Sequence, residues 1–332
     1  MSDERRIGWV DRARGLGMIA ILLFHTEVYY NGVEIIPYHF YTCNALITFF
    51  FVSGFLFKKP GKPFSLRHKL LSVVKWMIIP YFVFTTILAF PKAFVHDDAP
   101  LGEVMMRIVN GHASWFIAAL IVAEVFFAII LRWSQGHRKK LFLLCALPYL
   151  LIAFVYSIMD NEFLRELNVW CWQNAFLMLI FLFLGYAYRN GWLRQNDSFR
   201  PYYLLLLVFL MIIIKYVEYQ SNMLLTLEPI HITSFTMLLV DGIVSCQVIV
   251  GICKILPELR MIQWTGKHSL VYYFFCGAVP MGVAMVMQRC GVPYNGNYWL
   301  IILALILVYI ISTVITSIVF KCMHTIYHYF HF

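Results

Sequence analysis

Long apolar runs alternate with short polar segments along the whole chain of 332 residues. About 20 apolar residues in a helix cross the hydrocarbon core of a bilayer, and the backbone in lipid must satisfy its own hydrogen bonds. The pattern therefore predicts an all-α, multi-pass membrane protein of about ten transmembrane helices, forming one transmembrane domain over residues 1–332 without a separate soluble domain. The predicted spans lie near residues 11–30, 40–58, 70–90, 115–133, 141–159, 172–190, 201–219, 234–256, 268–288 and 298–321.

Basic residues concentrate in alternate loops. Most of the 26 lysines and arginines fall on the side of the N-terminus. The positive-inside rule then predicts that both termini lie in the cytoplasm. The longest connections on the opposite side are residues 91–114, 160–171 and 220–233. The first of these contains Leu101–Val109, whose apolar face predicts a short interfacial helix.

Composition agrees with a membrane protein, since 61% of the residues are hydrophobic and 13% are charged. The net charge of +9 follows from topology, so we expect the lipid bilayer and not nucleic acid as a partner. The eight cysteines form no CxxC motif, so we expect buried thiols and no metal site. The first apolar run contains His25 and Glu27, which favours a retained span over a cleaved signal peptide.

The first span carries Asp11, Arg14 and His25. On a helix, Arg14 and His25 share one stripe and lie about 16 Å apart along the axis, with Asp11 one turn below Arg14. Ionisable groups in a membrane are costly, so they mark a functional face. The alternatives are a structural histidine bonded to a neighbouring helix and an arginine at the interface. Arg12 points off the stripe and is interpreted as a topology residue, and Glu27 faces elsewhere.

Further candidates lie near the ends of later spans. Ser53 and Gly54 are small residues among aromatic ones, which favours close helix packing but also suits a gap for a thin ligand. The basic residues that follow, including Arg67, Lys69 and Lys75, suit either a topology signal with lipid contact or a phosphate site.

At the opposite side, Trp115 opens the fourth span after His112, a position that suits either a membrane belt or stacking on a sugar. Glu124 and Asp241 are intramembrane acids, which act in function or pair with another helix. Gly266 followed by Ser269 is typical of a loop that ends at a helix N-cap.

Taken together, these motifs resemble the integral-membrane acyltransferase-3 family. Four pieces match it in order: Asp11-x-x-Arg14-Gly15 with ten residues between Arg14 and His25; Phe49-Phe50-Phe51-Val52-Ser53-Gly54-Phe55-Leu56; the basic stretch from Arg67 and Lys69 through Lys75 to Pro80-Tyr81; and Gly266-x-x-Ser269-Leu270-x-x-Tyr273.

The resemblance implies transfer of an acyl group from a cytoplasmic acyl-CoA, usually acetyl-CoA, to a hydroxyl or amino group of an exported glycan. By the same resemblance His25 is the catalytic histidine with Asp11 in support, and Arg14, Arg67, Lys69, Lys75 and Ser53 are donor-side residues. His112 and Trp115 are candidates for the acceptor side. Two departures stand out. Phe274 replaces a histidine found in many members, and we expect no esterase-like domain of the kind that some members carry after the last span.

The resulting hypothesis is an enzyme of the bacterial cytoplasmic (inner) membrane that modifies a polysaccharide of the cell envelope by O-acetylation. The pantetheine arm of the acyl-CoA would pass between the first two spans, and His25 would act as general base. One alternative is a transporter or flippase for a lipid-linked sugar, with His25, Glu124 and Asp241 as a proton relay. A second alternative is a non-catalytic membrane scaffold or sensor. The acceptor, the acyl group, a covalent acyl-histidine and the oligomeric state stay open at this stage.

Overall fold

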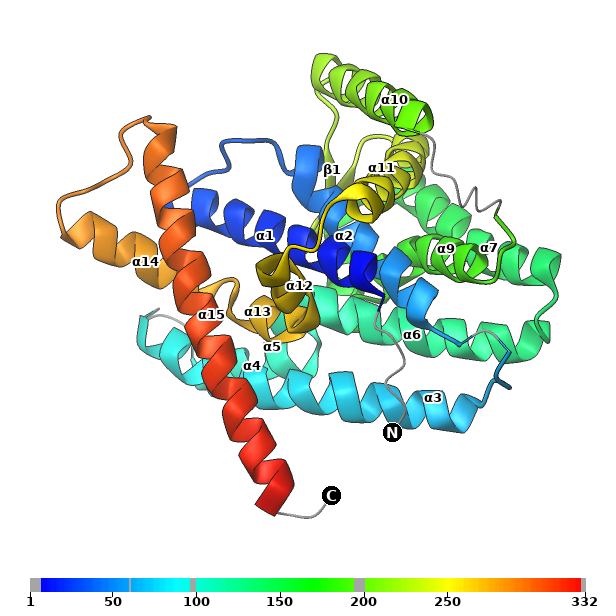
Figure 1. Cartoon of the computed structure of the whole chain (residues 1–332), viewed down its shortest axis with the longest axis horizontal. Helices are drawn as coiled ribbons and strands as arrows, with labels where there is room; N and C mark the ends of the chain where they lie inside the picture. The colour runs from blue at the N-terminus through cyan, green and yellow to red at the C-terminus, as the bar shows by residue number, and fades with distance from the viewer. Residues whose placement is uncertain (1–6, 60, 96–99, 194–200, 330–332) are drawn as a thin grey trace. The chain divides into compact units, whose positions relative to one another are not determined.

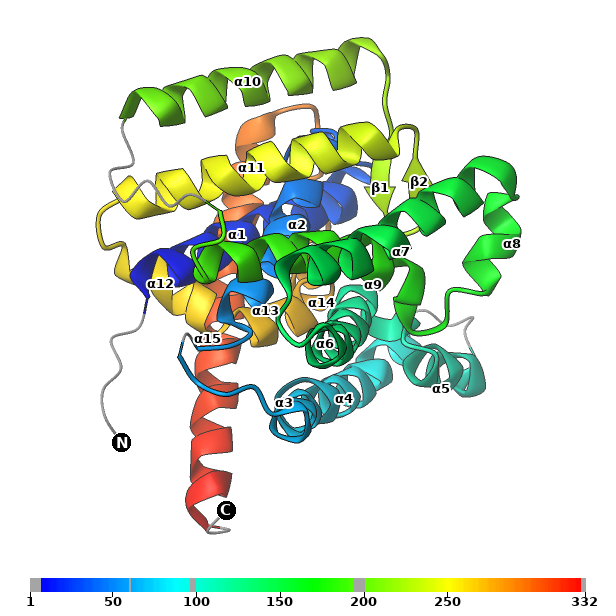
Figure 2. The same ribbon diagram turned by 90° about the vertical axis from the view of Figure 1, so that its right-hand side faces the viewer.

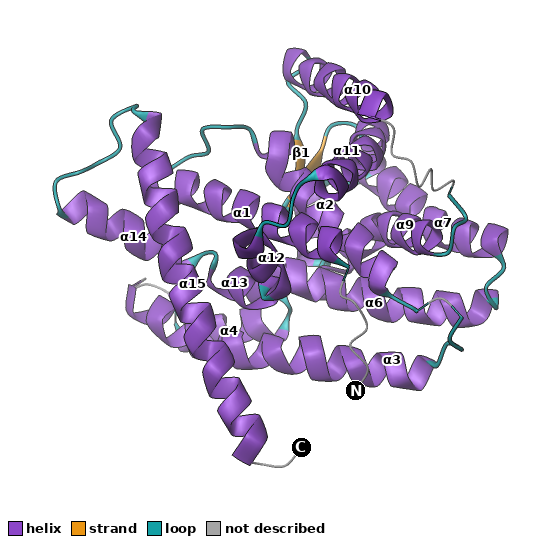
Figure 3. Ribbon diagram, in the orientation of Figure 1, coloured by secondary structure: helices purple, strands orange, loops and turns teal. Residues whose placement is uncertain are grey.

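A computed structural model describes residues 7–59, 61–95, 100–193 and 201–329 of the chain. Most of these residues are helical (Figure 3). The chain forms two compact units, one of residues 1–45 with 253–332 and the other of residues 46–252. The expectation of a single domain stays a prediction.

The first unit is built around α1 (Gly8–Asn31), shown in dark blue in Figure 1. α1 ends at Gly32, whose φ of 90° lies in the left-handed region and whose N–H donates to the Val28 carbonyl at 2.9 Å. Glycine takes this conformation without steric cost, so it stops the helix. The other helices of the unit are the start of α2 (Tyr38–Leu56), α12 (Arg260–Lys267), α13 (Ser269–Phe275), α14 (Ala278–Arg289) and α15 (Tyr298–Tyr329).

The second unit contains the rest of α2 and most of the remaining helices. In chain order they are α3 (Leu66–Val73), the π-helix η1 (Val74–Ile78), α4 (Ile79–Val95), α5 (Leu101–Val109), the 3-10 turn η2 (His112–Ser114), α6 (Trp115–Ser134), α7 (Arg138–Ile158), α8 (Asn161–Glu166), the 3-10 turn η3 (Val169–Cys171), α9 (Trp172–Arg189), α10 (Pro201–Gln220) and α11 (Phe235–Ile255). Strands β1 (Leu225–Leu227) and β2 (Ile230–Ile232) form a small antiparallel hairpin before α11.

Burial separates the central helices of this unit from the peripheral one. The apolar window of α9 is 72% buried, whereas that of α10 is only 17% buried. α10 runs beside α11 (Figure 2), held by Leu207 and Ile214 against Val244 and Val248. Most of α10 is therefore an apolar surface suited to lipid.

Each predicted span coincides with one helix or with two or three consecutive helices. By length and composition, eight helices of the described residues suit a membrane crossing, and nine do if the bent pair α13 and α14 forms one span. α1 is not among them, since it carries the charged residues Asp11, Arg12, Arg14 and Glu27. The multi-pass helical fold is confirmed, while the count of ten and the cytoplasmic termini stay predictions.

Local departures from the predicted pattern are few. The interfacial helix predicted at Leu101–Val109 is present as α5, although residues 96–99 of that connection lie outside the described ones. The predicted span 268–288 is broken between α13 and α14, whose axes differ by 48°. The hairpin of β1 and β2 has no counterpart in the prediction. Apolar composition signals burial in lipid and carries no information on bends or on two short strands in a loop.

Candidate functional site

The predicted stripe lies on one uninterrupted helix. α1 runs without a break through Asp11, Arg14 and His25. At 1.5 Å per residue, the eleven steps of this continuous helix correspond to about 16 Å along the axis between Arg14 and His25. Asp11 is buried at 7% exposure, while Arg14 and His25 are each half-buried. The stripe therefore has one buried acid and two partly accessible groups.

Aromatic rings surround His25 on its own helix. The ring of Phe24 meets it edge-on at 5.5 Å, and the ring of Tyr29, one turn away, stacks on it at 6.1 Å between centroids. The Tyr29 hydroxyl points toward Gly277 in the break between α13 and α14, where a Cβ would lie 3.6 Å from it. His25 is thus one helical turn from the residue that reaches the broken helix.

Two glycines let α1 and α12 touch backbone to backbone. A Cβ on Gly266 would overlap the carbonyl oxygen of Asp11, and a Cβ on Gly15 would overlap the carbonyl oxygen of Ile262. Small residues of this kind allow helices in a membrane to approach closely. The first and fourth motifs are therefore two sides of one helix contact. The prediction of a loop at Gly266 is wrong, because Gly266 lies inside α12. The residue directly before α13 is His268.

Arg12 has a role that the sequence did not indicate. It is buried, and its Nε donates a hydrogen bond to the carbonyl of Cys253 at 2.8 Å. Cys253 lies in the last turn of α11, where carbonyl groups have no partner within the helix. Arg12 therefore caps α11 and is not only a topology residue. Arg12 lies next to Asp11 in a segment where charged residues are costly, and this position in the sequence could have indicated a buried, paired arginine.

The second motif forms a second close helix contact. A Cβ on Gly54 would overlap the carbonyl oxygen of Leu182 in α9, and a Cβ on Gly185 would overlap that of Phe51 in α2. The two glycines lie on opposite helices of the same crossing, and each allows the backbone of the other helix to approach. The packing interpretation of Gly54 is thus the one that the structure supports, since the backbone of α9 fills the space beside it.

Three residues far apart in the sequence meet next to this crossing. Ser53 donates its hydroxyl hydrogen bond to Glu124, and Lys69 forms an ion pair with the same carboxylate at 2.8 Å. The ammonium of Lys69 also lies 4.2 Å from the centre of the Phe57 ring. Ser53 and Glu124 are buried. The carboxylate of Glu124 thus links α2 and α6 to the basic helix α3.

The other two predicted donor-side cations of this segment, Arg67 and Lys75, are exposed. Arg67 lies in the first turn of α3, and Lys75 lies on the π-helix η1 with its ammonium 5.4 Å from the Trp76 ring. A π-helical turn interrupts a regular helix and occurs often at functional sites. Among the three predicted cations of this segment, Lys69 is the one with a buried acid beside it.

His112 and Trp115 flank the start of α6. His112 opens the turn η2 and Trp115 is the first residue of α6, as predicted, and both are half-buried. The Trp115 ring packs edge-on against Phe116 at 5.9 Å. Both residues belong to the unit of residues 46–252, whereas His25 belongs to the other unit.

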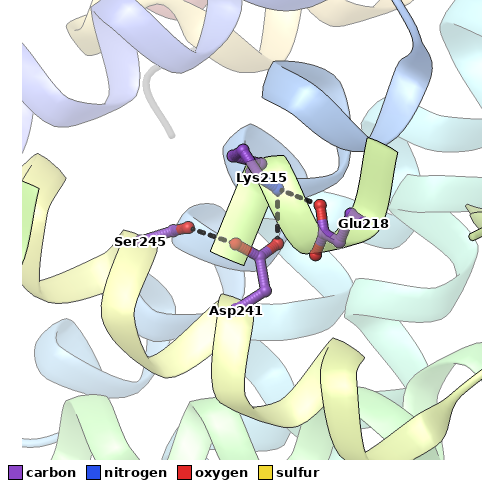
Figure 4. Close-up of polar contacts among 4 residues, drawn as sticks. All are labelled: Lys215, Glu218, Asp241 and Ser245. Atoms are coloured by element: carbon purple, nitrogen blue, oxygen red, sulfur yellow. Dashed lines mark hydrogen bonds and ion pairs between the residues drawn. The ribbon is translucent and has the colours of Figure 1, made fainter. Parts of the chain in front are cut away.

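The remaining intramembrane acids are paired. Lys215 on α10 lies 2.8 Å from Asp241 and 3.0 Å from Glu218, and Ser245 donates to Asp241 at 3.1 Å (Figure 4). Asp241 and Glu218 are fully buried. This network ties the peripheral helix α10 to α11, and it gives Asp241 a pairing role of the kind that the sequence left open.

Glu27 has a structural role that sequence reasoning did not assign to it. It is fully buried and accepts hydrogen bonds from the backbone N–H groups of Ile35 and Ile36, at 3.2 and 3.1 Å, and from the hydroxyl of Tyr298 at 2.6 Å. It therefore fixes the connection between α1 and α2 to the start of α15. An acid within an apolar run was the signal that could have identified it.

The helices and their buried ion pairs define a multi-pass membrane protein of the helical class. Over residues 7–319, the sequence matches the acyltransferase-3 family model, described as an acyltransferase domain. The chain therefore belongs to the acyltransferase-3 family and is a membrane acyltransferase. No curated protein and no solved structure gives a significant match to it.

Proposed function

We propose that this acyltransferase moves an acyl group, acetyl in the simplest case, from cytoplasmic acyl-CoA to a hydroxyl of a cell-surface or lipid-linked glycan. The observation that carries the proposal is α1, an unbroken helix that bears Asp11, Arg14 and His25 in a chain of the acyltransferase-3 family. The expected location is the bacterial cytoplasmic membrane, where a cytoplasmic donor and an exported glycan face opposite sides of one bilayer.

The donor would bind at the end of α1 that carries Arg14. Guanidinium groups form strong, charge-assisted hydrogen bonds with phosphate, and CoA carries several phosphates. The spacing of about 16 Å between Arg14 and His25 is comparable to the length of a pantetheine arm. A donor anchored at Arg14 and extended along α1 would therefore present its thioester near His25.

Lys69, Arg67 and Lys75 supply further positive charge for the donor. The ion pair with Glu124 holds the Lys69 ammonium in one place, and Ser53 in turn holds Glu124. We assign Ser53 and Glu124 as positioning residues for Lys69. Arg67 and Lys75, being exposed, would add longer-range attraction for the phosphates.

His25 would act as general base. It accepts the proton of the acceptor hydroxyl while the hydroxyl oxygen forms a bond to the thioester carbonyl carbon. The tetrahedral intermediate then breaks its carbon–sulfur bond, and the imidazolium returns the proton to the leaving CoA thiolate. The products are the glycan ester and CoA, so the reaction consumes no other reactant. Asp11 supports the first turn of the same helix and lies next to Arg14 in the stripe.

The proposal is tested by CoA release from the purified protein in the presence of acetyl-CoA and the cell-surface glycan fraction of the source organism. We expect release that requires the glycan. Arg14→Ala is expected to raise the KM for acetyl-CoA roughly 10- to 100-fold, as for a lost charge-assisted hydrogen bond, with a smaller change in kcat. Arg132→Ala, at an exposed position of α6, is the matched control.

The same assay separates the enzyme from the flippase alternative. Transport of a lipid-linked sugar consumes no acyl-CoA. If the wild-type protein in liposomes moves the glycan lipid across the bilayer and releases no CoA under any acyl donor, the proposed function is wrong.

A further inference from the structure

A polar cavity of about 120 Å³ lies within the unit of residues 46–252, and its lining includes none of the residues predicted for the donor. It is formed by the end of α7, the short helix α8 with the connection after it, and the hairpin of β1 and β2. Its lining residues are Tyr156, Asn161, Glu162, Arg165, Asn168, Glu228, Pro229, Ile230 and His231. Both connections that form it, residues 160–171 and 220–233, are predicted from the basic residues to lie on the side opposite the cytoplasm.

A network of buried amide side chains holds the cavity walls. The hydroxyl of Tyr156 donates to Gln173 at 2.5 Å, and the amide of Gln173 donates to the Leu164 carbonyl of α8 at 2.8 Å. Asn168 donates to Asn174 at 2.7 Å. Gln173, Asn174 and Asn168 are each at most 3% exposed. Since buried polar groups with full partners rigidify their surroundings, α7 and α8 are fixed in place at the cavity.

The hairpin is held by the same network. Asn174 donates a hydrogen bond to the carbonyl of Leu227, the residue directly before Glu228. The position of Glu228 is therefore set before any ligand arrives. A site that is already ordered loses little conformational entropy when a ligand binds to it.

Glu228 is the residue in this cavity that points to a ligand. Its Oε2 atom is buried and accepts no hydrogen bond within the described part of the chain. Burial raises the pKa of Glu228, and the nearby Arg165 guanidinium opposes this rise. A buried acceptor without a donor is uncommon and calls for an explanation, which a bound hydroxyl would provide.

The charges around the cavity select the ligand class. The lining includes two carboxylates, Glu162 and Glu228, and one guanidinium, Arg165, so it does not favour a phosphate or another anion. Carboxylate, guanidinium and amide groups together supply both acceptors and donors, as the hydroxyls of a sugar require. The volume is below the ~300–1,000 Å³ of drug-sized sites, which limits the ligand to a single small group.

We propose that this cavity binds one neutral sugar residue of the acceptor glycan, with Glu228 accepting from a sugar hydroxyl and Arg165 and Asn161 donating to others. This inference rests on the proposed function, because it assigns the acceptor of that reaction. It makes Glu228 and Arg165 specificity residues that are distinct from Arg14 and His25.

The test uses a panel of methyl glycosides of common hexoses, deoxyhexoses and N-acetylhexosamines as probes with the full-length, detergent-solubilised protein. We expect at least one glycoside to raise the melting temperature and to compete with the glycan in CoA release. Glu228→Gln and Arg165→Ala are each expected to weaken glycoside binding and raise the glycan KM about tenfold or more, as for lost hydrogen bonds to a charged group, and to leave the KM for acetyl-CoA unchanged. Glu166→Gln, an exposed acid of α8 that does not line the cavity, is the matched control.

The failure of this inference can be told apart from the failure of the proposed function. A wild-type protein that releases CoA with glycan, combined with variants whose glycan KM and glycoside binding stay within about twofold of wild type, overturns the cavity assignment alone. Absence of CoA release by the wild type overturns the proposed function, while glycoside binding that Glu228→Gln abolishes would still support a sugar site. Absence of glycoside binding to the wild type overturns the inference.

Discussion

At the scale of single residues, the acids within the apolar segments are matched by donors. Glu124 is bound by Ser53 and Lys69, Asp241 by Lys215, and Glu27 by backbone N–H groups and Tyr298. Removing one partner of a buried pair leaves an uncompensated charge, which costs about 3–5 kcal/mol. The cost of such residues made them recognisable from the sequence. Their side-chain partners Ser53, Lys215 and Tyr298 lie 71, 26 and 271 residues away, however, and no local pattern predicts them.

Glu228 gives a prediction of pH dependence at this scale. Burial raises the pKa of Glu228 in the folded protein. The contribution of the protonated Glu228 to the free energy of unfolding is therefore fully present below the ordinary carboxyl pKa, and it is lost as the pH rises through the raised pKa. Glu228→Gln cannot ionise and keeps that stability. Its melting temperature in detergent should therefore exceed that of the wild type by more at about pH 7 than at about pH 4.

The control for this measurement is Glu166→Gln, which removes a charge from an exposed position of α8. It should show no such pH-dependent gain. Equal differences between Glu228→Gln and wild type at both pH values would contradict the assignment of a raised pKa to Glu228.

At the scale of elements, paired glycines determine how the motif-bearing helices pack. Gly266 meets α1 at Asp11, and Gly54 and Gly185 serve the crossing of α2 and α9. The sequence showed small residues beside aromatic ones, which favoured close packing of Gly54 without naming its neighbour. It placed Gly266 in a loop because a glycine before a serine resembles a cap, whereas the contact with α1 is tertiary.

Gly266→Ala tests the contact between α1 and α12. The added Cβ overlaps the backbone of Asp11, and overpacking of this kind typically costs about 1–3 kcal/mol. We expect a lower melting temperature together with weaker protection by acetyl-CoA, since Asp11 and Arg14 share the displaced turn. Protection is measured as the rise in melting temperature at a fixed acetyl-CoA concentration.

The matched control is Gly282→Ala in α14, where a Cβ meets no heavy atom within 4 Å. An alanine there should leave stability unchanged or raise it slightly, because it reduces the freedom of the unfolded chain. A similar decrease in melting temperature in the two variants would show that the contact between Gly266 and Asp11 does not account for the effect of Gly266→Ala.

At the scale of the whole molecule, hydropathy predicted most of the helical architecture, while the orientation predicted from charge stays a prediction. The predicted apolar segments are helices in the structure, and α5 was located to the residue. The break between α13 and α14 and the β hairpin were not predictable, because bends and short strands in loops depend on contacts that hydropathy does not encode. For the site, the sequence identified Asp11, Arg14 and His25 on one helix, and missed the structural roles of Arg12 and Glu27.

Two exposed cysteines test the predicted orientation. Cys290 follows α14 on the side predicted to be outside, and Cys322 lies near the end of α15 on the side predicted to be cytoplasmic. The other six cysteines are buried. A membrane-impermeant maleimide should label Cys290 in intact cells and Cys322 only after permeabilisation, as read by peptide mass spectrometry. Cys290→Ser is the control. Labelling of Cys322 in intact cells would show that the predicted orientation is wrong.

The central claim is that His25 transfers a proton during acyl transfer from acyl-CoA to a glycan. The most direct measurement is the rate at which radiolabelled acetyl passes from acetyl-CoA to the glycan, compared between wild type, His25→Ala and the exposed His137→Ala at equal amounts of folded protein. We predict a rate about 10²–10⁴ times lower for His25→Ala, the range for loss of a general base, and an unchanged rate for His137→Ala. A His25→Ala protein that labels the glycan at the wild-type rate would contradict the account.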